Sequence, residues 1–386
     1  MRAWAEIDLD AIAHNFKEIK RVTSPDAKIM AVIKADAYGH GFTEVAHTLL
    51  QSGAHAFAVA TADEALQLRR AGFDVPVLIL GYVFVDEYEE LIKNGISLVA
   101  GSLDTAREIS CAAKKAGKRA KIHIKLDTGM GRIGFVCGDD DESVADEICS
   151  AAALDAIETE GIFSHFSKAD ETDLSYTRFQ FERFSHICSL IERRGLNIPI
   201  KHICNSAGII RLPEFHMDMV RAGIILYGLN PSDCPVWDKV NLKPAMTFKT
   251  KIVNIKNIKH ESSISYGGKY KASPGKKIAT IAVGYADGFS RILSNKASVL
   301  VRGKRAKVVG NMCMDQCMID VTDIEGVNLN DDVIIFGSDG NNTITVELVA
   351  SLLGTISYEV VCSVGKRIPR IYIQNGKTVS ILNYLL

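Results

Sequence analysis

The alternation of short apolar runs with amphipathic stretches of helical length between residues 28 and 228 constrains the fold more than any other feature of this sequence. Near-continuous apolar strands separated by helices are typical of a parallel sheet covered by helices. The presence of eight such runs predicts that the sheet closes into a (β/α)8 barrel. The clearest helical patterns lie at 41–51, 62–70 and 104–116. The eight predicted strands cover residues 28–34, 55–60, 76–81, 97–100, 120–127, 158–165, 200–205 and 219–227.

The pattern changes after residue 230, where short strands follow one another with short turns and little helix. A chain of 386 residues is long enough for a barrel of about 250 residues and a second, smaller domain. We therefore expect an α/β fold in which residues 1–230 form the barrel and 231–386 form a mainly β C-terminal domain. The sequence leaves open whether about the first ten residues pack with the barrel or with the β domain. The predicted C-terminal strands are 246–258, 277–283, 298–309, 317–321, 333–336 and 368–373.

Charge and cysteine usage narrow the function classes. The formal charge is −1, which gives no electrostatic reason to expect binding to nucleic acid or to an anionic membrane. The nine cysteines are odd in number and never spaced as C-x-x-C, so we expect neither a disulfide framework nor a metal site. No stretch has the length to cross a bilayer, and the start lacks the apolar core of a signal peptide. These features predict a soluble cytoplasmic protein that acts on small molecules.

The end of the first predicted strand carries the strongest functional signal. Catalytic groups of barrels come from the C-terminal ends of strands and the loops after them. Lys34 ends an apolar run and is followed by Ala-Asp-Ala-Tyr-Gly-His-Gly. A solvated lysine that closes a strand is the ordinary interpretation, but the dense Tyr, Gly and His residues weigh against it. The segment resembles the lysine motif of alanine racemases, a family with a barrel that binds pyridoxal 5'-phosphate (PLP) followed by a β domain.

The resemblance extends over nearly the whole chain, with matching order and spacing. It is carried by further segments at 125–134, 164–166, 202–207, 221–228, 265–267, 284–288, 312–318 and 356–359. The glycine-rich run after residue 127 is no nucleotide loop, because it lacks both G-x-G-x-x-G spacing and a Gly-Lys-Ser/Thr end.

The resemblance implies two opposed proton carriers. Lysine can form a reversible imine with PLP when its amine is partly unprotonated, and Lys34 is matched to that role. Tyr266 matches the second base, which in the family reaches in from the partner subunit of a homodimer. Without the resemblance, a structural aromatic in a turn would be the preferred interpretation of Tyr266. Tyr285 is a rival that we expect along the substrate access path, and a packing tyrosine is the alternative there.

The cofactor contacts follow from the same resemblance. Arg221 stands in an apolar strand and needs a buried acceptor. The family places it on the pyridine nitrogen with His202 holding the guanidinium, and a barrel salt bridge is the alternative. His165 is expected to face the cofactor ring, or to be a buried core histidine. For the phosphate, the resemblance implies the backbone amides of Gly223 and Ile224 and the hydroxyls of Ser206, Tyr38 and Tyr358.

Substrate contacts are implied on both domains. Arg132 can bind a carboxylate with two hydrogen bonds, and the resemblance makes it the anchor of the substrate acid, with the backbone N–H of Met314 as partner. Lys125 occupies a position that is carbamylated in some relatives, and an unmodified lysine is the alternative. The bulk of Tyr358 should leave room for a methyl group and crowd larger side chains. We therefore expect alanine as substrate.

One departure from the family pattern affects the access path. The family segment before Cys-Met-Asp commonly contains Gly-Arg, whereas this chain has Asn311 after the glycine. An arginine of the substrate corridor is therefore missing, and we expect Asp315 to lack the partner that it has in relatives.

The implied function is the interconversion of L- and D-alanine for cell-wall peptidoglycan. A serine or broad-specificity racemase is the first alternative. A PLP-dependent decarboxylase is a second, although such enzymes typically pair the pyridine nitrogen with a carboxylate and carry a glycine-rich phosphate loop. A PLP-binding protein without catalysis is a third, and it would have no use for Tyr266 or Arg132.

Overall fold

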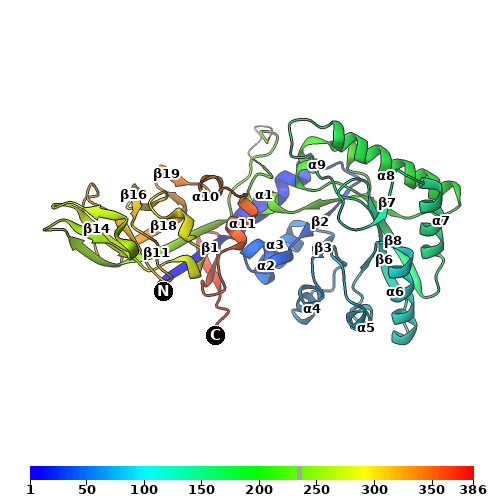
Figure 1. Ribbon diagram of the computed structural model, residues 1–386. Helices are drawn as coiled ribbons and strands as arrows, with labels where there is room; N and C mark the ends of the chain where they lie inside the picture. Colours follow the sequence, from blue (N-terminus) through cyan, green and yellow to red (C-terminus); the bar gives the residue numbers. More distant parts are fainter. Residues whose placement is uncertain (233–236) are drawn as a thin grey trace.

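The computed structural model describes residues 1–232 and 237–386 and contains two lobes that lie end to end (Figure 1). Among these residues, eight parallel strands form the barrel in the order β10-β2-β3-β4 and β5-β6-β8-β9. A bridge between Leu78 and Ser97 joins the two arcs on one side. On the other side the Arg221 amide donates to the Cys204 carbonyl at 3.0 Å. The predicted barrel is thus confirmed. Its strands are β2 (Lys28–Val32), β3 (Ala56–Val59), β4 (Val77–Ile79), β5 (Leu98–Ala100), β6 (Ala120–Asp127), β8 (Ile157–Phe163), β9 (Ile200–His202) and β10 (Met219–Ala222).

Helices cover the outside of these strands, and local sequence defines their ends. Thr61 and Glu64 form a capping box at the start of α4 (Ala62–Arg70). Ser102 caps α6 (Leu103–Ala116), and Gly117 ends it in the left-handed conformation. The other helices of this lobe are α1 (Leu9–Val22), α3 (Phe42–Ser52), α5 (Tyr88–Lys93), α7 (Asp141–Ala152), α8 (Ser175–Arg193) and α9 (Ser206–Arg211).

The last barrel strand is shorter than the sequence pattern predicts. We expected a strand over 219–227, but β10 ends at Ala222 and a 3-10 turn, η3 (Ile224–Tyr227), follows. Gly223 breaks the strand with φ −117° and ψ −108°. The apolar run continues because the turn is buried, and the Tyr227 hydroxyl donates to the Val32 carbonyl at 3.0 Å. Continuous burial therefore concealed the end of the strand.

The second lobe is built on a ten-stranded sheet with the order β19-β18-β15-β16-β17-β14-β11-β1-β20-β21. The strand predicted at 298–309 is a hairpin, because Arg302 and Gly303 both adopt positive φ between β15 and β16. Two helices, α10 (Val346–Leu353) and α11 (Ser357–Cys362), were not predicted. The strands are β11 (Met246–Asn257), β14 (Lys277–Ile281), β15 (Ser298–Val301), β16 (Lys304–Val309), β17 (Cys317–Asp320), β18 (Asp332–Asp339), β19 (Asn342–Ile344), β20 (Arg370–Gln374) and β21 (Lys377–Leu382), with a separate hairpin of β12 (Ser262–Ile264) and β13 (Tyr270–Ala272).

Both chain ends connect the two lobes. The N-terminal strand β1 (Ala3–Asp8) pairs antiparallel with β11 and parallel with β20, and then leads into α1 of the barrel lobe. Near the C-terminus, two side chains of the β lobe bind the barrel lobe. The Arg370 Nε donates to the Gly39 carbonyl at 2.9 Å, and the Tyr384 hydroxyl donates to Asp36. Residues of the β lobe therefore support the loop that follows the first barrel strand.

The structure also bears on membrane-spanning helices and on the state of the cysteines. No helix in residues 1–232 and 237–386 combines the length and the apolar character needed to cross a membrane. The eight cysteines in these ranges have free thiols, and Cys234 lies outside the described residues.

Candidate active site

Lys34 lies at the C-terminal end of β2, at the start of a turn with unusual backbone geometry. The four residues Ala35 to Tyr38 all have φ between 52° and 55°, which is the left-handed helical region. This conformation costs about 1–2 kcal/mol for each L-residue, and such strain gathers at functional sites. The turn, labelled α2 (Lys34–Gly39), places Lys34 and Tyr38 on the same short segment at the barrel mouth.

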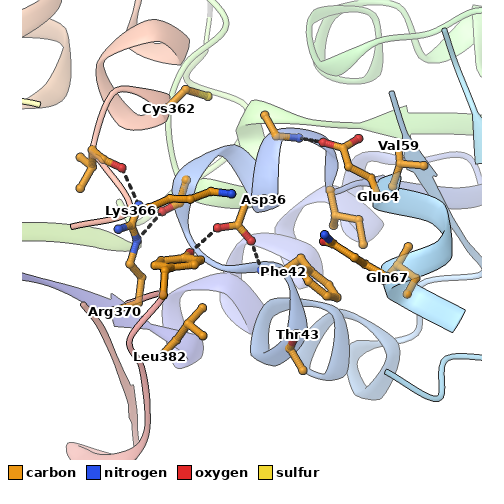
Figure 2. Close-up of a pocket in the computed structure, with 16 residues that line it drawn as sticks. Asp36, Phe42, Thr43, Val59, Glu64, Gln67, Cys362, Lys366, Arg370 and Leu382 are labelled. Carbon is orange, nitrogen blue, oxygen red and sulfur yellow. Dashed lines mark hydrogen bonds between the residues drawn. The ribbon is translucent and has the colours of Figure 1, made fainter. Parts of the chain in front are cut away.

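Side chains from two other segments hold this turn in place (Figure 2). Glu64 accepts a hydrogen bond from the Ala35 amide at 2.6 Å. Asp36 accepts from the Phe42 amide at 2.9 Å and from the Tyr384 hydroxyl. A cavity of about 450 Å³ lies beside these residues. Glu64 was missed from the sequence, where the capping pattern of α4 gave no sign that its carboxylate also binds the turn after Lys34.

The surroundings of Lys34 favour its neutral amine. Burial lowers the pKa of Lys34, and the positive charge of Arg132 lowers it further, whereas Glu64 raises it. The structure therefore brings Arg132, which the sequence placed in the loop after β6, within electrostatic reach of Lys34. The neutral amine, which a lowered pKa favours, is the form that attacks an aldehyde to give an imine and that accepts protons.

Arg221 is a buried cation whose acceptors are all neutral. Its side chain is 3% exposed. Nη1 donates to His202 Nδ1 at 2.8 Å, and Nη2 donates to the Ser164 carbonyl at 2.7 Å and to the Ile203 carbonyl at 3.1 Å. His165 Nδ1 lies 3.1 Å from Nη2. Within the described ranges Arg221 forms no ion pair with a carboxylate, so the salt-bridge alternative does not apply there. Burial lowers its pKa to about 10, which leaves it charged at neutral pH.

The predicted phosphate donors converge beside Arg221. The Gly223 amide donates to the Ser206 hydroxyl at 3.0 Å. A methyl group added at Gly223 would lie 3.0 Å from the Tyr38 hydroxyl and 3.5 Å from that of Ser206, so only glycine leaves this space free. The rings of Tyr38 and Tyr358 lie 6.0 Å apart. The amides at the start of η3 have no acceptor inside the turn. These N–H and O–H groups lie close together and form a cluster of donors, the anion cradle, that suits an anion.

Lys125 and Arg132 lie at the end of β6 and in the loop after it. Lys125 is 2% exposed, and its amine donates to the Leu126 carbonyl at 2.6 Å and lies 5.2 Å from the Phe163 ring centre. Burial, with the charge of Arg221, lowers the pKa of Lys125 to about 7. Asp127 accepts from the amides of Gly129, Gly131 and Arg132, each at 3.0 Å. The loop is therefore fixed while the Arg132 side chain stays exposed.

The β lobe presents a second group of predicted residues on one exposed face. Tyr266, Met314 and Tyr285 are 71%, 52% and 42% exposed. The loop at 310–315 connects them. Asn311 Nδ2 donates to the Tyr266 carbonyl at 2.6 Å, and the Ser265 hydroxyl donates to the Asn311 carbonyl. The amide of Tyr285 donates to the Cys313 carbonyl at 3.1 Å.

This face is separate from the barrel mouth. Within the described ranges the Tyr266 hydroxyl forms no hydrogen bond. Strand β14, which follows the β12–β13 hairpin that carries Tyr266, lies at the end of the molecule away from the barrel (Figure 1). The site residues therefore fall into a barrel group, with Lys34 and Arg221, and a β-lobe group, with Tyr266 and Met314.

The structure gives Asp315 a partner that the sequence did not indicate. Residue 311 is not an arginine, but Arg367 Nη2 donates to the Asp315 carboxylate at 2.7 Å. Arg367 follows α11, far along the sequence, and no local pattern connects it to the 310–315 loop. Asn311 takes a different role from the arginine expected there, since its amide binds the backbone of the Tyr266 turn.

The barrel is followed by a β domain, and a lysine of lowered pKa and a buried arginine lie at the barrel mouth. This arrangement fits the class of PLP-dependent enzymes built on a barrel. Residues 7–231 match the family model of the N-terminal domain of alanine racemase, and residues 245–372 match the model of its C-terminal domain. The chain belongs to the alanine racemase family of PLP-dependent isomerases, and its cofactor is PLP.

Individual relatives agree over the full length. The alanine racemase of Methanococcus maripaludis is 49% identical over 370 residues, which cover 96% of this chain and 98% of that protein. The solved alanine racemase of Clostridium difficile 630 has a TM-score of 0.96 and 42% identity, and the match covers 100% of this chain and 99% of that one. The Bacillus anthracis alanine racemase, solved with bound L-Ala-P, has a TM-score of 0.93 and 37% identity, covering 100% and 98%.

The Asn311 amide should stabilise the Tyr266 turn. A hydrogen bond contributes about 1 kcal/mol, so Asn311→Ala should speed amide exchange at residues 265–268 about fivefold. Hydrogen exchange read by mass spectrometry measures this in the purified protein. Asn257→Ala, an exposed asparagine on β11, is the control and should leave the exchange unchanged. Equal exchange in Asn311→Ala and the unaltered protein would show that the contact carries no stability.

Proposed function

We propose that the protein interconverts L- and D-alanine, with PLP bound to Lys34 and with Lys34 and Tyr266 as opposed proton carriers. The observation that carries the proposal is the convergence of Lys34, the buried Arg221 and the anion cradle at one barrel mouth. Relatives named alanine racemase that are 49% and 48% identical over nearly the full length support the substrate.

The residues at the barrel mouth fit PLP. The space kept free by Gly223 between two hydroxyls suits a phosphate group, whose further donors would be the Ile224 amide and the Tyr358 hydroxyl. The Gly223 amide would join them by exchanging its present acceptor, the Ser206 hydroxyl, for the phosphate. Arg221 would donate to the pyridine nitrogen and His165 would face the ring. Lys34, on the strained turn beside Tyr38, would bind the aldehyde. When bound, PLP withdraws electrons from the substrate Cα–H bond and so makes that proton removable.

Racemisation requires one proton carrier on each side of Cα. The lowered pKa of Lys34 favours its neutral amine, which would accept the proton on its own side. The phenol of Tyr266, when supplied by a partner subunit, would return a proton from the other side. Neither residue can invert the stereocentre alone, because each reaches one face.

Arg221 directs the outcome toward proton return. An arginine donates a hydrogen bond but does not give up a full proton, so Arg221 would leave the pyridine nitrogen of bound PLP with less positive charge than a carboxylic acid would. Arg221 would thereby favour return of the proton to Cα. The neutral set of acceptors around Arg221 weighs against the decarboxylase alternative, in which a carboxylate faces this nitrogen.

Substrate selection involves both lobes. Arg132 would bind the substrate carboxylate together with the backbone N–H of Met314 from the partner subunit, and Tyr285 would line the access path. The half-buried Tyr358, beside Tyr38, limits the space for the substrate side chain and favours alanine over larger amino acids. A serine racemase stays the alternative, since packing rejects one extra small group only modestly.

Replacing the two proton carriers tests the proposal. Lys34→Ala should abolish both the visible absorbance of covalently bound PLP and racemisation. Tyr266→Phe should keep the absorbance and lower kcat about 10²- to 10⁴-fold, the range for losing a general acid or base. A coupled D-alanine assay and an absorbance spectrum give the two measurements. Tyr270→Phe removes a hydroxyl from the same hairpin and should stay near the unaltered rate. Normal racemisation by Lys34→Ala would rule the mechanism out.

We also propose a homodimer in which the β lobe of one subunit completes the site of the other. Tyr266, Tyr285 and Met314 are large side chains with exposures of 71%, 42% and 52%, and exposed groups of this kind are typical of an interface. A hollow of about 780 Å³ lies beside Tyr266 and could receive the partner. A two-fold dimer with two composite sites is the simplest closed arrangement.

Co-expression of two inactive variants tests the composite site. In a mixed dimer of Lys34→Ala and Tyr266→Phe subunits, one site combines both defects and the other combines both intact residues. Random pairing should restore about one quarter of the unaltered activity, since half of the dimers carry one working site of two. Racemase activity of the mixed population, corrected for the amount of dimer, is the measurement. No recovery above the separate variants would contradict a site shared between subunits.

Lys125 is a candidate for carbamylation. Its burial and its pKa of about 7 supply the neutral amine that reacts with carbon dioxide, and the charge of Arg221 disfavours the ammonium form. The carbamate would be an acceptor able to orient Arg132. With 13C-bicarbonate supplied, a carbamate 13C resonance should appear and grow from about pH 6 to about pH 8 as the amine loses its proton. Lys125→Arg keeps the positive charge and should lack the carbamate resonance. If the unaltered protein also lacked this resonance, Lys125 would be an ordinary, unmodified lysine.

We further propose a cytoplasmic location and a role in supplying D-alanine for peptidoglycan. The free thiols of the described cysteines are the usual state in a reducing compartment. The role in cell-wall supply follows from the family resemblance.

A further inference from the structure

A chain of buried polar side chains continues from Arg221 through the barrel interior. His202 accepts a hydrogen bond from Arg221. The Nε2 atom of His202 lies at a distance of 2.9 Å from the Nδ1 atom of a second histidine, His123. His123 Nε2 in turn lies 3.8 Å from the Glu160 carboxylate, an electrostatic contact longer than a hydrogen bond. Both histidines are at most 3% exposed, whereas the Glu160 side chain is 19% exposed. No role proposed above uses His123 or Glu160.

The far end of the chain lies at the N-terminal ends of the strands, opposite the barrel mouth. The Ser97 hydroxyl, just before β5, donates to one Glu160 oxygen at 2.6 Å. The amine of Lys121, the second residue of β6, binds the other oxygen at 2.7 Å. Glu160 is therefore fixed from two sides, and the chain spans the barrel interior from the mouth to its base.

Two backbone features make room for this chain and set its direction. The pairing of β6 with β8 shifts register between Ile122 and His123, which face Thr159 and Gly161, so Glu160 is the extra residue of a bulge. Bulges change the direction of a side chain and occur near functional sites. A methyl group at Gly161 would lie 2.3 Å from His123 Nδ1, so this glycine makes the space that the imidazole fills. The polar chain thus depends on a local departure from regular strand geometry.

Donor and acceptor chemistry gives the chain one direction. Arg221 can only donate, so His202 Nδ1 must accept and a neutral His202 must carry its proton on Nε2. That proton is then donated to His123 Nδ1, which leaves the proton of His123 on Nε2, toward Glu160. Burial lowers the pKa of His123 to about 4 and lowers that of His202 well below its ordinary value, against the opposing charge of Glu160 on His123. Both rings are neutral at physiological pH, and the chain ends on a carboxylate.

We propose that Glu160 is a positioning residue that acts on Arg221 through His123 and His202, an inference that rests on the proposed contact of Arg221 with the cofactor nitrogen. The carboxylate favours the tautomer of His123 with its proton on Nε2. That tautomer keeps a lone pair facing His202, which keeps the His202 lone pair facing Arg221. With the opposite tautomer, an N–H of His202 would face an N–H of Arg221, and the guanidinium would lose its orientation.

The tautomers are measured directly on the full-length protein as purified. Nitrogen NMR of 15N-histidine protein, assigned with His123→Gln and His202→Gln, should show both rings neutral, with Nδ1 unprotonated and Nε2 protonated. In Glu160→Gln the His123 resonances should move. A proton on Nδ1 of either ring, or an imidazolium at neutral pH, would overturn the proposal whether or not the protein is active.

Matched charge removals separate positioning from general effects. Glu160→Gln should lower kcat about tenfold with little change in KM, the lower end of effects seen for outer partners of a site, and should change the visible spectrum of bound PLP. Glu158→Gln removes the same charge from an exposed position two residues earlier on β8 and should match the unaltered enzyme. Equal kcat and spectra in the two variants would overturn the proposal.

A second variant covers failure of Glu160→Gln to fold. Ser97→Ala frees one carboxylate oxygen and changes no charge. Ser97→Ala should lower kcat at least about twofold and should move the His123 resonances. If both kcat and the resonances stayed unchanged, the proposal would be overturned. If the unaltered protein neither binds PLP nor racemises alanine, the proposed function fails. The tautomer measurement still decides whether the row of polar side chains from Arg221 to Glu160 is oriented as inferred.

Discussion

The structure depends most on one buried positive charge. Arg221 lies inside the barrel with neutral acceptors only, and a guanidinium in such a place is costly unless its donors are occupied. Its field extends to the neighbouring groups, because burial weakens screening. The pKa values of His165, His202 and Lys125 are all lowered, first by burial and then by Arg221. Burial, assisted by one fixed cation, therefore favours the neutral forms of these three side chains, which can act as acceptors or nucleophiles.

The strained turn after Lys34 needs support from a distance. Four consecutive left-handed residues cost about 4–8 kcal/mol together, which is comparable to the whole stability of a domain. Glu64 in the barrel lobe and Tyr384 and Arg370 in the β lobe bind this turn and offset its strain. The β lobe thus supports the lysine of its own chain, in addition to the proposed contribution of Tyr266 to a partner.

The sequence predicted the barrel because strands buried on both faces leave continuous apolar runs. The motifs that end those strands also point to Lys34, Arg221 and Gly223, which the structure brings to the barrel mouth, while their roles toward a cofactor stay a proposal. The sequence missed residues whose roles depend on contacts between distant segments. Glu160 acquires its direction from a bulge, and Asp315 finds Arg367 more than 50 residues away. Asn311 was interpreted as a missing arginine, whereas its amide binds the Tyr266 turn. The helices α10 and α11 were missed because their apolar runs are as short as those of strands.

The charge distribution at the barrel mouth favours the binding of anionic ligands. Lys34, Lys125, Arg132 and Arg221 act electrostatically on one another, as the shared lowering of the lysine pKa values indicates. The neighbouring carboxylates of Asp127 and Glu64 are already bound by backbone amides, so their hydrogen-bonding capacity is largely used within the fold. The proposed phosphate beside Gly223 and the proposed substrate carboxylate beside Arg132 would add negative charge where the protein supplies mainly positive groups. Because ligands that bind only the folded state stabilise it, cofactor and substrate should contribute to the stability of the mouth that binds them.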